Sequence, residues 1–236
     1  MLAIYKRELR SYFITPIGYV FTTVFLIMSG LAFSFMTLQS STTNVSNYYV
    51  LVMFFFIILI PLLTMKMFSE EKKTKTEQIL LTSPISITDM VLAKFLAAYT
   101  LFAATLLASC VFFISLYVYG TPNTAVLIAT TLGILLIGGA FIALGLFISS
   151  LTENQLIAAL ITIVSIFAML GLGLITSSIP DNMTALRVVL KWVSVFDRYY
   201  AFTFGIFDFN ALLYYISIIG VFIFLTVRVY EKRRWE

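Results

Sequence analysis

The sequence contains no histidine and only one cysteine, Cys110, among its 236 residues. Without histidine, the chain has no imidazole for acid–base catalysis or for metal binding. A lone cysteine also excludes an intrachain disulfide and a cysteine cluster for zinc or an iron–sulfur centre. We therefore expect no catalytic residue, no metal site and no enzymatic activity in this chain.

Charged residues are scarce as well. They make up 11% of the chain, against about 25% in ordinary soluble domains, while hydrophobic residues make up 61%. The 15 basic and 11 acidic side chains are too few to cover the surface of a soluble fold of this length. The composition therefore predicts an integral membrane protein. Cationic groups beside lipid headgroups then explain the net charge of +4, so we expect the lipid bilayer, and no nucleic acid, as a partner.

Six apolar stretches are each long enough for a helix to cross a bilayer, which takes about 20 residues. Backbone polar groups in lipid must be satisfied within their own segment, so we interpret all six as helices. The fold class is therefore an all-α integral membrane protein, with residues 1–236 forming a single domain. The predicted spans cover residues 17–38, 48–67, 91–119, 124–150, 156–177 and 211–229.

The distribution of lysine and arginine predicts the orientation. With six spans, both termini lie on the same side of the membrane. Twelve of the 15 basic residues fall on that side, in the amino-terminal segment, the second-to-third connection and the carboxyl tail. Because positively charged loops stay in the cytoplasm, we expect both termini to be cytoplasmic in a multi-pass protein of a plasma membrane.

Residues 1–14 have the pattern of an amphipathic helix. Apolar and aromatic residues recur on one face, with Lys6, Arg7 and Arg10 beside it. Such a helix lies in the interface plane, with its rings toward the acyl chains and its cations toward the headgroups. We expect an interfacial helix here, and its role as a plain anchor or as a docking surface stays open.

The uncharged cores of the spans contain no ionisable side chain other than tyrosine and Cys110. Ion-coupled carriers and voltage sensors place charged groups inside the membrane, so this absence disfavours both classes. No glycine is followed by lysine, which excludes a phosphate-binding loop of the G-x-x-x-x-G-K-[ST] type. If the protein moves a substrate, a separate polypeptide supplies the energy.

The connection over residues 68–90 is the densest charge cluster in the chain, yet it contains an apolar run at 79–81. Thr74 or Thr76 can cap a short helix, with Glu77 in its first turn, and Pro84 ends it. This pattern predicts a short amphipathic helix that offers its apolar residues to a partner outside the membrane. Packing of the same residues on the protein's own cytoplasmic face remains an alternative.

The same stretch resembles the first cytoplasmic loop of ABC-2 type permeases, the membrane subunits of one class of ABC exporters. The family pattern runs E-E-x-x-x-x-T-x-x-x-L-L-x-S-P-I-S, followed by a lysine that opens the next span. It is matched by Glu70, Glu71, Thr76, Leu80, Leu81, Ser83, Pro84, Ile85, Ser86 and Lys94.

Two other stretches strengthen the resemblance, which covers nearly the whole chain. Residues 145–155 are similar to the short cytoplasmic turn of those permeases, and the carboxyl-terminal 42 residues or so resemble one branch of the family. That branch includes gliding-motility-associated permeases and a copper-system permease for nitrous oxide reductase. Its pattern has a histidine before the final span, where residues 197–200 stand here.

The resemblance implies a bacterial exporter in which two six-span subunits, either two copies or two paralogues, work with two cytoplasmic ATPases. ATP and Mg²⁺ would be bound by the ATPases, so no cofactor is expected in this chain. The 68–90 loop would form a coupling helix, and residues 178–210 would contain outer re-entrant helices that close the exit. For 178–210, a surface helix without a gating role remains the alternative.

The implied site residues fall into three groups. The ATPase-coupling group comprises Glu70, Glu71, Thr76, Glu77, Ile79, Leu80, Leu81, Ser83 and Pro84. The cytoplasmic interface comprises Lys6, Arg7, Arg10, Lys94, Glu153 and Asn154. The outer gate comprises Trp192, Phe196, Tyr199 and Tyr200. Two rival functions stay open: a membrane scaffold that recruits a cytoplasmic partner and moves nothing, and an ion-coupled carrier.

Overall fold

A computed structural model describes residues 1–40, 42–77, 86–178 and 194–235 of the protein. All regular structure in these described ranges is helical. Six helical segments are long and apolar enough to cross a membrane, which confirms the predicted fold class. These segments are Pro16–Leu38, Ser46–Lys73, Ile87–Tyr119, Thr124–Leu151, Gln155–Gly173 and Phe209–Arg233.

Several of the segments contain a break or a change of helix type. The first is an α-helix that becomes a π-helix, and the third is interrupted by a 3₁₀ turn. The elements are α1 (Leu2–Ile14), α2 (Pro16–Phe33), the π-helix η1 (Ser34–Leu38), α3 (Ser46–Thr64), α4 (Ser69–Lys73), α6 (Ile87–Ser109), η2 (Cys110–Phe113), α7 (Ile114–Tyr119), α8 (Thr124–Leu151), α9 (Gln155–Ser178), α11 (Val195–Tyr200), η3 (Ala201–Phe204) and α12 (Phe209–Trp235).

Short polar side chains set where several helices begin. The Ser86 hydroxyl accepts a hydrogen bond from the backbone N–H of Asp89 at 3.1 Å and caps α6. Asn123 accepts from the N–H of Ala125 at 3.1 Å and caps α8. These bonds satisfy N–H groups that have no partner within the helix, so each span starts at a defined residue.

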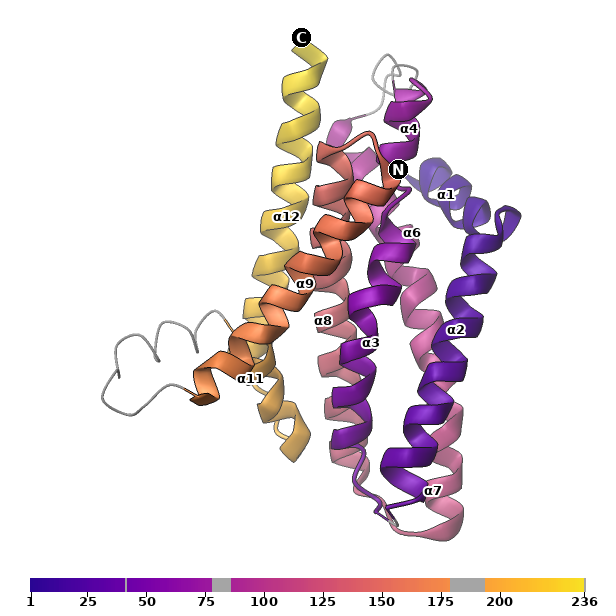
Figure 1. Ribbon diagram of the computed structural model, residues 1–236, viewed down its shortest axis with the longest axis vertical. Helices are drawn as coiled ribbons and strands as arrows, with labels where there is room; N and C mark the ends of the chain where they lie inside the picture. Colours follow the sequence, from indigo (N-terminus) through magenta and orange to yellow (C-terminus); the bar gives the residue numbers. More distant parts are fainter. Residues whose placement is uncertain (41, 78–85, 179–193, 236) are drawn as a thin grey trace.

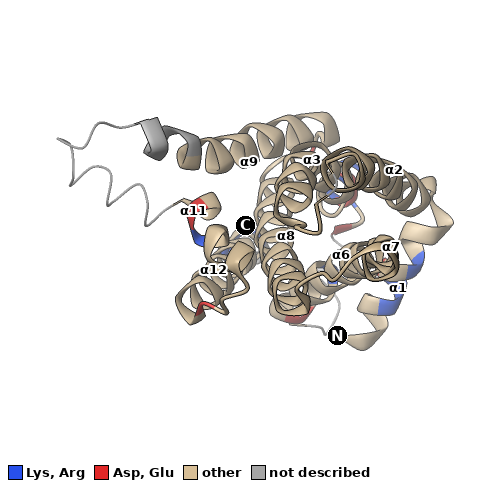
Figure 2. Ribbon diagram, turned by 90° about the horizontal axis from the view of Figure 1, so that it is seen from below, with Lys and Arg blue, Asp and Glu red and all other residues tan. Residues whose placement is uncertain are grey.

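Helix α8 lies at the centre of the bundle, with α3, α6 and α12 around it (Figure 2). Its glycines allow this close packing. A Cβ added at Gly138 would lie 2.2 Å from the Phe102 ring of α6, and one at Gly145 would lie 2.3 Å from the Thr64 hydroxyl of α3. The small residues of α8 therefore serve helix packing within one chain.

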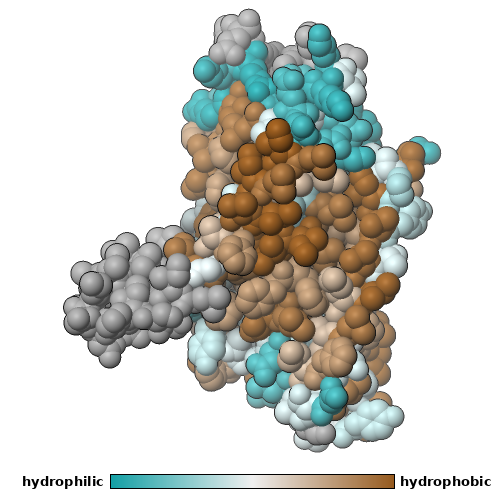
Figure 3. Space-filling model, in the orientation of Figure 1, coloured by the Kyte–Doolittle hydropathy of each residue, from teal (hydrophilic) through white to brown (hydrophobic). Residues whose placement is uncertain are grey.

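The surface has a hydrophobic belt with polar residues at its two ends (Figure 3). Exposed apolar residues include Leu156, Leu160 and Val164 of α9, as expected for a helix that faces lipid. Both chain termini lie at the same end of the bundle, together with α1 and α4 (Figure 1). We call this the basic end.

Candidate functional site

The centre of the candidate site is a buried lysine. Lys94 lies in the second turn of α6, and only 1% of its side chain is exposed. Its ammonium donates to the backbone carbonyl of Met67 at 2.9 Å and to the Glu71 carboxylate at 2.8 Å. A second carboxylate, that of Glu8, lies 3.3 Å away. The ammonium also lies 5.1 Å from the centre of the Phe68 ring.

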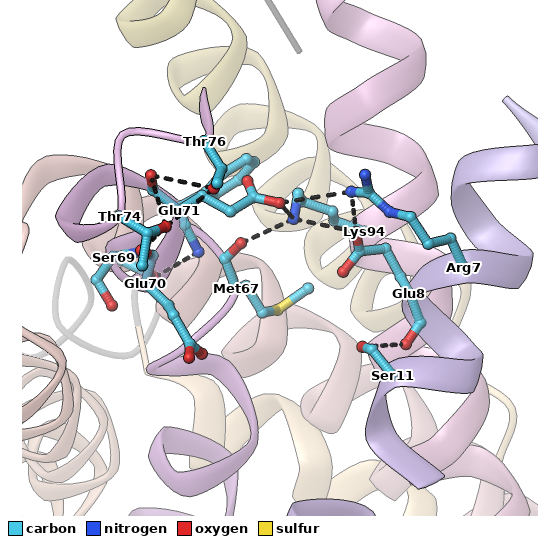
Figure 4. A network of polar contacts seen from close by, with 12 residues as sticks. Arg7, Glu8, Ser11, Met67, Ser69, Glu70, Glu71, Thr74, Thr76 and Lys94 are labelled. Atoms are coloured by element: carbon cyan, nitrogen blue, oxygen red, sulfur yellow. Dashed lines mark hydrogen bonds and ion pairs between the residues drawn. The ribbon is translucent and has the colours of Figure 1, made fainter. Parts of the chain in front are cut away.

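These contacts join three separate elements into one network (Figure 4). Glu8 belongs to α1, Glu71 to α4 and Lys94 to α6. Arg7 completes the network, because its guanidinium lies 2.5 Å from Glu8 and 3.5 Å from Glu71. A charge removed from water is tolerated when it is paired and hydrogen-bonded, so Glu8 and Glu71 stabilise the burial of Lys94. Arg7 is itself exposed and contacts the two carboxylates from the solvent side.

The start of α4 is fixed on the end of α8. The Ser149 hydroxyl accepts hydrogen bonds from the backbone N–H groups of Phe68 at 3.1 Å and Ser69 at 3.2 Å. The ammonium of Lys72 donates to the backbone carbonyl of Ser150. Both serines of α8 are fully buried. The end of the second span, which includes α4, is therefore anchored on the fourth span as well.

Helix α4 ends in a turn that redirects the chain. The N–H of Thr74 donates to the carbonyl of Glu70 at 2.9 Å, and Lys75 adopts a left-handed conformation with φ of +56°. The hydroxyls of Thr74 and Thr76 lie 3.0 Å apart. The Thr74 hydroxyl also donates to the Glu70 carbonyl, so the side chain of Thr74 caps the end of α4. Helical backbone resumes at Glu77.

The turn also contacts the last span. A carboxylate oxygen of Glu77 lies 3.6 Å from the guanidinium of Arg233 on α12. The ring of Phe68 packs on Tyr230 of α12 at a centroid distance of 4.7 Å. The segment 65–77 thus contacts α1, α6, α8 and α12, which means that a displacement of this segment reaches four helices directly.

A cavity of about 580 Å³ opens beside the network, between α1 and α4. Its charged lining consists of three cations and three carboxylates: Arg7, Lys66, Lys94, Glu8, Glu70 and Glu71. Lys66 and Glu70 form an exposed pair at 3.9 Å, which contributes little to stability. The cavity places the paired groups next to solvent on one side.

The predicted coupling residues are only partly covered by the structure. Glu70, Glu71, Thr76 and Glu77 all lie at the basic end, where Glu71 and Glu77 make ion pairs. The others lie outside the described residues: Ile79, Leu80, Leu81, Ser83 and Pro84.

The predicted interface residues occupy two kinds of position. Lys6 and Arg10 are exposed on α1, and Glu153 and Asn154 are exposed in the turn between α8 and α9. The Asn154 side chain accepts from the N–H of Leu156 at 2.9 Å, which caps α9. Lys94 differs from the expectation. Its ammonium is buried between α1 and α4, where it contacts the carboxylates of Glu8 and Glu71, so Lys94 is not a surface cation.

The predicted outer residues that the structure describes contact different helices. Trp192 lies outside the described residues. Phe196 packs against α9, where a Cβ added at Gly173 would lie 2.6 Å from it, and Tyr199 packs against Gly133 of α8. Tyr200 is exposed. The Tyr199 hydroxyl is buried without a hydrogen-bond partner among the described residues, and burial raises the pKa of this hydroxyl.

Sequence reasoning missed Glu8, Ser149 and Ser150. Glu8 is the one acidic residue in an otherwise basic amphipathic helix. A single carboxylate among cations could have indicated an ion pair with another part of the chain. The two serines gave no signal, because serine in an apolar helix usually bonds to its own backbone.

Comparison with known protein families identifies the family of this chain. A search of curated proteins finds no match, but a family model described as ABC-2 family transporter protein matches residues 31–229. The match includes Glu71 and Lys94 and leaves α1, with Arg7 and Glu8, outside. The matched range runs from the first span into the last of the six apolar helices, so this multi-pass membrane chain belongs to the ABC-2 family of transporter proteins.

Proposed function

We propose that this chain is the permease subunit of an ATP-driven ABC exporter. Two such subunits, either identical or paralogous, form the pathway, and separate cytoplasmic ATPases that bind ATP and Mg²⁺ drive it. The observation that carries the proposal is the attachment of segment 65–77 to four helices, through buried contacts to α6 and α8 and partly exposed ion pairs to α1 and α12.

A motor outside the membrane can move a bundle only through a segment that is rigidly joined to it. The ion pairs of Glu71 with Lys94 and Arg7 join this segment to α6 and α1. The bonds to Ser149 and the Glu77–Arg233 pair join it to α8 and α12. Displacing the loop therefore changes discrete, packed contacts, as energetic coupling between distant sites requires.

The orientation follows from the basic residues. With both termini cytoplasmic, the basic end faces the cytoplasm, where an ATPase is available. The exposed turn at Glu153 and Asn154 gives the ATPase a second contact at α8 and α9. The residues 79–81 supply the apolar contact, and α1 lies along the headgroups of the same leaflet.

The composition of the spans supports an external energy source. Their cores lack charged side chains that could bind and release a coupling ion, and the sequence has no phosphate-binding loop. These features disfavour the ion-coupled carrier. The scaffold alternative uses the same docking loop, so only a measurement of transport separates it from the permease.

The decisive experiment introduces a charge into the docking residues. Leu80→Asp is expected to leave the protein inserted in the membrane while abolishing co-purification of an ATPase from native membranes. ATP-dependent transport in vesicles from that strain should be lost as well. Asn44→Asp, which adds the same charge in the loop before α3, serves as the matched control and should behave as wild type.

Three outcomes would contradict the proposal. If Leu80→Asp retains both the ATPase and transport, the coupling assignment is wrong. If an ATPase associates but no transported ligand stimulates its activity, the scaffold function is favoured. Transport that continues without an ATPase and follows an ion gradient would favour the carrier.

A further inference from the structure

The end of the first span, far from the basic end, has an unusual backbone. Over Ser34–Leu38 the chain forms a π-helix. The N–H of Gln39 donates to the carbonyl of Ser34 at 2.9 Å, and the N–H of Thr42 donates to that of Thr37 at 3.2 Å. Both bonds span five residues. Single π turns widen a helix and occur frequently at functional sites.

The Thr37 hydroxyl in this turn has no partner. Its side chain is buried, with 1% of the residue exposed, and its Oγ1 makes no hydrogen bond to any described residue. Other buried threonines of the spans donate to the carbonyl four residues earlier in the chain. These are Thr64, Thr105, Thr130, Thr162 and Thr226. Thr37 is the exception, and it is the one that lies within the π-helix.

A buried hydroxyl without a partner costs free energy, so a group that bonds to it gains affinity. Thr37 lines a cavity of about 340 Å³, a volume typical of small ligand pockets. The lining residues belong to the end of the first span, the loop that follows it, and α7 with Gly120. Helix α7 lies at the lower end of the bundle in Figure 1. Its hydroxyl-bearing residues are Thr37, Thr42, Thr43, Ser115 and Tyr119.

One wall of the cavity depends on a glycine. Gly120 has an extended backbone, which any residue adopts, so only space constrains this position. A Cβ added there would lie 2.9 Å from Cγ2 of Thr43. Alanine at position 120 would therefore push Thr43 and alter the opening between the two loops.

The lining determines the chemical class of ligand. It contains hydroxyls that both donate and accept, together with the apolar side chains of Leu38 and Leu116, and no charged residue among the described ones. A phosphate or carboxylate would enter without a counter-charge, which is unfavourable. A neutral group with several hydroxyls matches both the polar and the apolar lining.

We infer that this cavity binds a neutral, hydroxyl-rich group, a hexosyl or glycerol moiety, and that the Thr37 side chain turns on binding so that its buried hydroxyl bonds to the group. The cavity lies where the first apolar span ends. A span of this length reaches from one headgroup region to the other, so its end lies near lipid headgroups. The group therefore comes either from a glycolipid of that leaflet or from a free sugar in the adjoining water. The binding chemistry is the same for both sources.

The test uses the full chain in nanodiscs of phosphatidylcholine, prepared without glycoside detergents because their sugar headgroups would compete. The probes are monoglucosyl diacylglycerol added to the nanodisc lipid, diacylglycerol as its headgroup-free match, and glucose in solution. Wild type should show a saturable rise in melting temperature with the glucosyl lipid and none with diacylglycerol. An equal rise with glucose alone would identify the free sugar as the source.

Two variants distinguish a specific site from a general lipid effect. Thr37→Val removes the hydroxyl at constant shape and should abolish the ligand-induced rise without lowering the melting temperature of the ligand-free protein. Thr226→Val, at a fully buried threonine that bonds only to its own helix, should keep the rise. Gly120→Ala should weaken binding at least several-fold through the displaced Thr43.

The inference would be overturned if wild type responded to neither sugar probe. It would also be overturned if Thr37→Val bound as tightly as wild type. A ligand-free Thr37→Val protein that melts well below wild type would show that the hydroxyl already has a partner within the protein, and this too would contradict the inference.

Discussion

The ammonium of Lys94 lies 2.8 Å from the carboxylate of Glu71, and this pair joins the start of the third span to α4, the short helix at the end of the second. The lysine side chain is 1% exposed and the glutamate side chain is 18% exposed. The contact therefore combines the two properties that transmission of a movement requires: it connects separate helices, and water competes with it little.

Removing the lysine charge tests this pair. Lys94→Met keeps an unbranched side chain but leaves the carboxylates of Glu8 and Glu71 facing each other with only the exposed Arg7 as a shared cation. We expect the free energy of unfolding to fall by about 3 kcal/mol, the lower end of the range for breaking a buried pair. Unfolding in mixed micelles, followed by circular dichroism, measures the loss. Lys66→Met, which breaks an exposed pair, should lower it by less than about 1 kcal/mol. Equal losses would contradict the burial of Lys94.

A second prediction concerns the anchor on α8. Ser149→Ala removes the acceptor for the buried N–H groups of Phe68 and Ser69. Because unpaired buried donors carry their full desolvation cost, stability should fall by about 1–3 kcal/mol. Ser217→Ala removes an exposed hydroxyl that bonds only to its own helix and should change stability by no more than about 0.5 kcal/mol. Hydrogen exchange should also increase at residues 68 and 69 in the first variant alone.

A third prediction concerns the close approach of α8 and α6. Gly138→Ala places a Cβ 2.2 Å from the Phe102 ring and should destabilise the protein by about 1–3 kcal/mol through overpacking. Gly220→Ala is the matched control, because nothing lies within 4 Å of its added Cβ. Melting temperatures in the same micelles compare the two. A stable Gly138→Ala protein would mean that these helices are farther apart than described.

A fourth prediction concerns the turn after α4. Lys75 has a φ of +56°, a conformation that costs a residue with a Cβ about 1 kcal/mol or more and costs glycine little. Lys75→Gly should therefore raise the free energy of unfolding by about 1 kcal/mol. Lys73→Gly, in the last turn of α4, should instead lower it by about 0.5–1 kcal/mol. The opposite signs of the two changes are the diagnostic result, since loss of a positive charge is common to both.

The candidate site could be predicted only in part. Residues 70, 71, 76 and 77 stood out because charge and an apolar run occur together there. The helix at Ser69–Lys73 was not expected, since five residues carry too little periodicity to predict it. The partners of Lys94 were equally hidden, because Glu8 lies on another helix and no local pattern connects the two residues.

The sequence by itself determined the class of the protein, the number of its spans and the concentration of its cations at one end. Those properties depend on the length of apolar runs and on counts of charge, and the bilayer allows only helices to satisfy the backbone of such runs. Tertiary structure alone decided which cation is buried, which serine holds the α4 segment and which buried threonine hydroxyl lacks a partner among the described residues. These depend on contacts between helices distant in the chain, and their geometry follows from packing rather than from any local pattern.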